Sequence, residues 1–126
     1  MNEILQEPIG KVTADNLLAV LESADANIAY AEERVENAKY NRDLAKINLE
    51  GVEAGVILTF SAVAKNQTEL SAKVDANQFV QDAKIKLAMA EKNLNAAQRE
   101  YNRQENRFTA ARKIASMDAE LSTYRK

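Results

Sequence analysis

Apolar residues recur along two long stretches of the chain at alternating steps of three and four positions. Positions with this spacing lie on one face of an α-helix, and two such faces pair in a coiled coil. The first row consists of Leu17, Leu21, Ala24, Ile28, Ala31, Val35, Ala38, Arg42, Ala45 and Leu49. The second row consists of Val80, Ala83, Leu87, Ala90, Leu94, Ala97, Tyr101, Gln104, Phe108, Ala111 and Ala115. The pattern therefore predicts two long helices, and only Arg42 places a charge in a row.

Local signals set the expected ends of these helices. Thr13 followed by Asp15 is typical of a helix start, because an acidic residue in the first turn complements the helix dipole. Gly51 and Gly55 interrupt the residues that favour helix, and the apolar segment around them lacks the charged outer face of its neighbours. We expect one domain over residues 1–126, with a flexible arm (1–12), a helix (14–50), an apolar connection (51–67) and a second helix (68–121).

The predicted fold is all-α: two long antiparallel helices form a coiled-coil-like hairpin that oligomerises. Large residues alternate with Ala in both rows, and one hairpin buries only one stripe per helix, so its core would be thin. It would leave Val12, Leu18, Val20, Ile47, Leu70, Val74 and Ile85 in need of further cover. For the connection, we favour an oligomer interface over a tip inserted into a membrane or a partner groove. The interface residues would be Val56, Ile57, Leu58, Phe60 and Val63.

Composition argues against an enzyme. The chain has no Cys and no His, so it lacks thiolate chemistry and the commonest general base and metal ligand. Acidic pairs such as Glu32 with Glu36 have helical spacing, but a di-metal helical bundle normally also needs His, so we expect no metal and no cofactor. The longest apolar stretch is too short to span a bilayer and the N-terminus shows no secretory pattern, so we expect a cytoplasmic protein that does not act at membranes.

Two basic stripes are candidates for binding nucleic acid. Cations spaced three or four residues apart share a helix face and can follow a phosphate backbone, while Tyr40 or Tyr101 could stack on a base. The stripes are Lys39, Arg42 and Lys46 on the first helix and Arg99, Arg103 and Arg107 on the second. The alternative is that they are solvated faces paired with neighbouring acids such as Asp43, Glu100 and Glu105. Arg42 could instead fix the register of the helices, and Tyr101 and Phe108 could belong to the core.

The second half of the chain resembles the UvsY-like family of phage recombination mediators. The likeness runs from Glu69 to Met117, from TELSAKVDANQFVQDAKIKLAMAE to NRFTAARKIASM, and includes the Val-Asp-Ala step at Val74–Ala76. The resemblance implies an all-helical, ring-forming protein that binds single-stranded DNA and helps to load a RecA-like recombinase in place of a single-stranded-DNA-binding protein. It points to Lys46 and Arg42, which match the family's basic residues before the connection. The connection GVEAGVILTF is apolar here, where the family's is polar and basic.

Two functional hypotheses follow. The first is a phage-type recombination mediator, a homo-oligomer that binds single-stranded DNA in the cytoplasm of a host bacterium and meets the recombinase and the single-stranded-DNA-binding protein. The second is a non-enzymatic interaction protein, such as a scaffold, assembly chaperone or host-defence inhibitor, that binds no DNA. The net charge of −2 mildly favours the second hypothesis.

Overall fold

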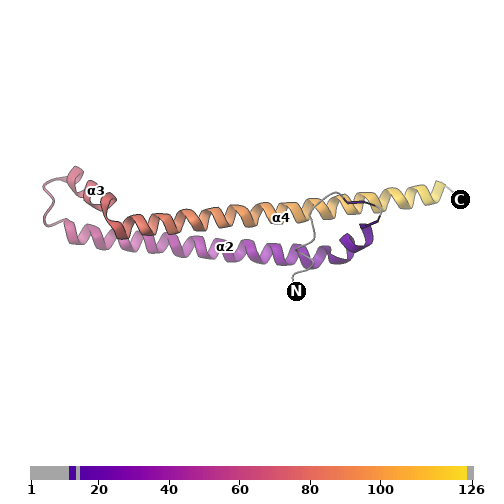
Figure 1. The fold of residues 1–126 in the computed structure, drawn as a ribbon, viewed down its shortest axis with the longest axis horizontal. Helices are drawn as coiled ribbons and strands as arrows, with labels where there is room; N and C mark the ends of the chain where they lie inside the picture. Colours follow the sequence, from indigo (N-terminus) through magenta and orange to yellow (C-terminus); the bar gives the residue numbers. More distant parts are fainter. Residues whose placement is uncertain (1–11, 14, 125–126) are drawn as a thin grey trace. The chain divides into compact units, whose positions relative to one another are not determined.

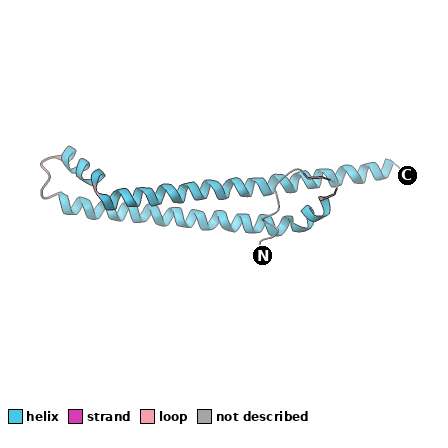
Figure 2. Cartoon of the chain, in the orientation of Figure 1, coloured by secondary structure: helices cyan, strands magenta, loops and turns pink. Residues whose placement is uncertain are grey.

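The described part of the chain is built from helices. The computed structural model describes residues 12–13 and 15–124, with side chains up to Met117. Within that part, α2 spans Leu17–Phe60, α3 spans Gln67–Ala76 and α4 spans Gln78–Tyr124, and no strand forms (Figures 1 and 2). The all-α fold class is confirmed. The predicted arm, residues 1–12, lies outside the described residues except for Val12.

Packing divides the chain into two compact units, which we describe separately. Unit 1 comprises Met1–Val35 and Ala96–Lys126, and unit 2 comprises Glu36–Asn95. In each unit α2 and α4 run in opposite directions and pack against each other. Every residue of both predicted rows is buried or partly buried, so the predicted helix faces are confirmed.

The core of unit 2 lies where α2, α3 and α4 meet. Val80 is fully buried and packs with Val56 of α2 and Val74 of α3. Four partly buried residues surround them: Leu49, Val52, Phe60 and Leu70. The Nζ atom of Lys73 lies 5.7 Å from the centre of the Phe60 ring and covers it. This cluster joins the three helices of unit 2.

Helix α2 continues ten residues beyond the predicted end at Glu50 and contains both Gly51 and Gly55. A glycine inside a helix costs only about 1 kcal/mol relative to Ala. Burial of Val56 and partial burial of Val52 and Phe60 offset that cost, because the inward spacing of three and four continues from Leu49 to Val56. The glycines therefore do not end the helix, and the connection shortens to residues 61–66.

The predicted second helix is two helices. Asn77 has an extended backbone, with φ −68° and ψ 131°, and its N–H donates to the carbonyl of Val74, which ends α3. The Asn77 side-chain oxygen accepts hydrogen bonds from the backbone N–H groups of Phe79 (2.9 Å) and Val80 (3.3 Å), which starts α4. One capping residue therefore breaks the expected continuous helix. The change of direction at Asn77 lets Val74 of α3 pack in the core.

The start of α3 gives a test of local stability. The Asn66 side-chain oxygen accepts a hydrogen bond from the Glu69 N–H at 2.8 Å, and the Glu69 carboxylate accepts one from the Lys65 N–H at 3.1 Å. We expect Asn66→Ala to lower the free energy of unfolding by about 1 kcal/mol, measured by urea denaturation followed by circular dichroism. The control is Gln67→Ala, which changes an exposed side chain one residue later. Equal stability of the two variants would contradict the capping role.

Candidate interaction surfaces

The first basic stripe lies on α2 in unit 2 and is partly neutralised by its own chain. Lys39 is exposed and its Nζ lies 3.7 Å from a carboxylate oxygen of Glu36. Arg42 is partly buried, and its guanidinium is 2.9 Å from the Asp43 carboxylate, to which its Nε also donates a hydrogen bond. Lys46 is exposed. Surface ion pairs of this kind are weak, so Lys39 remains accessible to an anion, whereas Arg42 is held beside the helix seam.

The second basic stripe belongs to unit 1 and does not form one exposed row. Arg99 is exposed, and Arg103 lies 3.4 Å from the Glu100 carboxylate. Arg107 is only 8% exposed. An arginine buried in this way cannot present its guanidinium to a phosphate backbone in the folded protein. For the other five cations, a role in binding nucleic acid stays a prediction.

Arg107 belongs to a buried polar layer of unit 1. Asn27 of α2 and Gln104 of α4 are buried with it, and the three residues line one small internal space. Gln104 donates a hydrogen bond of 2.8 Å to Glu100, and Asn27 donates one of 3.4 Å to Ser23. Val20, Ser23, Ala24 and Phe108 also line this space. Polar residues at a helix seam favour one pairing register over others, so this layer has a structural role.

The aromatic candidates fall into two groups. Tyr40 is 65% exposed, so it could stack on a ligand or a partner. Tyr101 and Phe108 are partly buried on the seam of α4, as expected for core residues. Arg112 lies over the Phe108 ring, with its Cζ 5.6 Å from the ring centre.

The five residues predicted for an oligomer interface are split by the structure. Val56 is buried and Phe60 partly buried within unit 2. Ile57, Leu58 and Val63 are exposed by 42%, 77% and 64%. Only Ile57, Leu58 and Val63 are therefore available to a partner. Ile57 and Leu58 belong to α2, and Val63 follows it.

Helix α2 carries a second apolar row on its outer face, which was not predicted from the sequence. All of its members are exposed, and they recur at steps of four and three within unit 2. Leu58 is the most exposed of them, and Tyr40 and Ile47 are each 65% exposed. We call this row the outer stripe: Tyr40, Leu44, Ile47, Gly51, Ala54 and Leu58. No member is charged, so the stripe is a helix face suited to packing against another helix.

The small residues of this face leave open space above α2. A Cβ atom built on Gly51 or Gly55 would have nothing within 4 Å. The fold of unit 2 therefore does not require glycine at either position.

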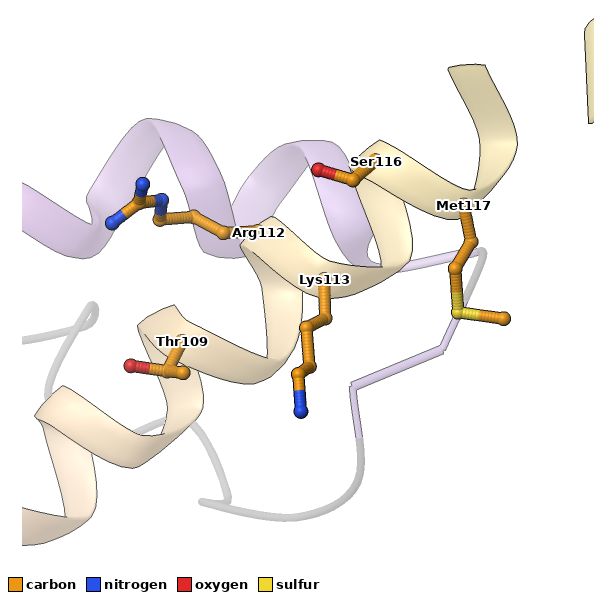
Figure 3. Close-up of a pocket in the computed structure, with 5 residues that line it drawn as sticks. All are labelled: Thr109, Arg112, Lys113, Ser116 and Met117. Atoms are coloured by element: carbon orange, nitrogen blue, oxygen red, sulfur yellow. The ribbon is translucent and has the colours of Figure 1, made fainter. Parts of the chain in front are cut away.

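A groove lies on the last third of α4 in unit 1 (Figure 3). The described residues that line it are Thr109, Arg112, Lys113, Ser116 and Met117. All five side chains are exposed and come from one helix face, with Lys113 and Met117 pointing the same way. Two cations and two hydroxyls could hold an anion weakly, but no buried group orients them.

Other kinds of site find no support in the described residues. There, no group of three or more acidic side chains comes together in a way that could hold a metal ion. No helix in that part of the chain is long and apolar enough to cross a membrane.

Comparison with known proteins gives no relationship: no family model matches the chain, and no curated protein or solved structure is significantly similar to it.

Proposed function

We propose that this protein is a non-enzymatic helical assembly protein whose copies associate through the outer face of α2. The observation that carries the proposal is the outer stripe, in which Leu44, Ile47 and Leu58 are exposed at helical spacing without an intervening charge. Exposed side chains of this size on one helix face mark interaction surfaces. The absence of His and Cys from the sequence supports a binding role over a catalytic one.

A second candidate function is the single-stranded-DNA-binding recombination mediator, acting with a RecA-like recombinase and a single-stranded-DNA-binding protein in the cytoplasm. Four exposed cations favour it: Lys39 and Lys46 on α2, and Arg99 and Arg103 on α4. Neither Lys46 nor Arg99 makes an ion pair within the part of the chain that the structure describes. Because Arg42 is partly buried beside Asp43 and Arg107 is buried, fewer cations support this function than the sequence suggested.

Size-exclusion chromatography with light scattering separates the two candidates. The chain is run with and without a fluorescent single-stranded oligonucleotide at about 50 mM salt and at about 500 mM salt, a range over which exposed charges become screened. The assembly proposal predicts a particle of at least twice 14.0 kDa at both salt concentrations, with no oligonucleotide in the peak. Oligonucleotide carried at low salt and lost at high salt would support the mediator. A monomer at both salts would contradict the assembly proposal.

A further inference from the structure

We infer that unit 1 carries a second contact between copies, in which the outer face of α2 of one copy binds the outer face of α4 of the next. The partner is another copy of this chain, and the two helices of the contact run antiparallel. The inference rests on the proposed assembly, because this contact joins copies that the outer stripe has already paired. The contact lies in unit 1 of both copies, whereas the outer stripe lies in unit 2.

The outer face of α2 in unit 1 is acidic. Five exposed residues recur there at steps of four, three, four and three, so they share one side of the helix, away from the buried Ala24 and Ala31. We call this set the acidic row: Leu18, Glu22, Asp25, Ala29 and Glu32. Glu22 and Asp25 are like charges one helical turn apart, an arrangement that weakens a helix. Within the described residues no ion pair neutralises the carboxylates of this row, so a basic partner would relieve their repulsion.

The outer face of α4 in unit 1 is basic. Its exposed residues recur at steps of three, four, three and four and include no acid. We call this set the basic row: Arg103, Asn106, Ala110, Lys113 and Met117. The side chains of Lys113 and Met117 point the same way (Figure 3). Lys113 therefore takes the place on this face that the predicted stripe gave to the buried Arg107.

The two rows carry their charges at the same separation. Glu22 and Glu32 are ten residues apart, and so are Arg103 and Lys113. Ten residues of helix span about 15 Å. Two pairs of opposite charges can therefore meet at once when the rows lie side by side. Charge complementarity of this kind selects the partner and fixes its register.

The uncharged members of the rows set the direction. In an antiparallel pair Leu18 lies opposite Met117, and these exposed apolar side chains, 68% and 61% exposed, cover each other. In a parallel pair Leu18 would lie opposite Arg99. Antiparallel pairing also sets each alanine of the rows opposite a larger residue, whereas parallel pairing would set Ala29 opposite Ala110 and leave a gap between them. Packing therefore favours the antiparallel contact.

The contact does not close between two copies. Within unit 1, α2 and α4 pack through the faces that lie opposite these rows, so one copy presents its acidic row and its basic row on different sides. Unlike surfaces that bind each other leave one row of each copy free for the next copy. Exposed ion pairs are individually weak, so the contact holds where paired copies present the rows more than once. Growth beyond the pair should therefore be lost as salt screens the charges.

Charge reversal in the full-length chain tests the contact. Light scattering after size exclusion, at about 50 mM and about 500 mM salt, should show wild-type particles of more than two copies at low salt and of two copies at high salt. Glu22→Lys with Glu32→Lys makes both rows basic, so this variant should stay at two copies at low salt. Adding Arg103→Glu and Lys113→Glu to the same chain restores opposite charges and the wild-type net charge, and should restore the larger particles.

The matched control is Asp82→Lys with Glu91→Lys, which makes the same change in net charge at exposed positions of α4 in unit 2. It should grow at low salt as the wild type does, and circular dichroism checks that every variant keeps its helix content. Growth of the two-residue row variant, or no growth of the four-residue variant, would overturn the contact. A wild-type chain of two copies at both salts would also overturn it and leave the proposed function standing. A wild-type monomer at both salts would contradict the contact and the proposed function together.

Discussion

Replacing Leu44 and Ile47 together by Glu is expected to abolish self-association and to leave the helices intact. These side chains are 47% and 65% exposed, so in a single chain the new carboxylates stay in water. In the assembly they would be buried without partners, which costs several kcal/mol per interface. A loss of about 4 kcal/mol raises a dissociation constant roughly 1,000-fold. Analytical size exclusion gives the association and circular dichroism gives the helix content.

The matched control carries the same number of new charges on another face. Ala88 and Asn93 are exposed on α4 in unit 2, so their joint replacement by Glu changes the charge equally without touching the outer stripe. We expect the control to associate as the wild type does. If both double variants dissociate, charge alone explains the effect, and if neither does, the stripe is not the interface.

Val80→Asp is expected to have the largest effect on stability. Val80 is fully buried between Val56 and Val74, so an aspartate there would be an unpaired buried charge. Such changes lower the free energy of unfolding by at least about 3 kcal/mol. Thermal denaturation followed by circular dichroism measures the loss.

The adjacent residue supplies the control for this prediction. Phe79 is 73% exposed, so Phe79→Asp removes a large apolar side chain without opening the core. We expect the melting temperature of Phe79→Asp to stay close to that of the wild type. Comparable destabilisation by the two substitutions would show that the cluster around Val80 does not hold α3 to the long helices.

The inward rows were predictable from sequence because helix periodicity determines which positions face a partner helix. All residues of both rows are buried or partly buried, and even Gln104 is placed correctly among them. The rows did not predict that Val20, Asn27 and Arg107 are buried beside them, and Val20 was wrongly expected to need further cover. A straight helix drifts by about 20° per heptad, so at the ends of long helices the buried face moves onto neighbouring positions. A strict alternation of three and four cannot follow that drift.

The helix ends were harder to predict because they depend on tertiary contacts. Glycine is a weak signal against helix, and the packing of Val56 and Phe60 outweighs it. Asn77 lies inside the helix predicted over residues 68–121, yet it caps two helices at once. Only the position of Val74 in the core explains why the chain turns there.

The prediction of the candidate site differs most from what the structure shows. The basic stripes were recognised by spacing alone, and spacing does not reveal that Arg107 points inward or that Arg103 meets Glu100. The outer stripe has the same three-and-four spacing as the core row. Its members Gly51 and Ala54 are small, so its apolar pattern was hard to recognise in the sequence. Scoring every face of the helix, and not only the most apolar one, would have found it.

Sedimentation equilibrium of the wild-type chain, at about 1 to 100 µM, measures whether copies of the chain associate. We expect a mass that rises with concentration to at least twice 14.0 kDa, and this minimum is insensitive to salt, because the outer stripe is uncharged. A mass of 14.0 kDa throughout that range would contradict it.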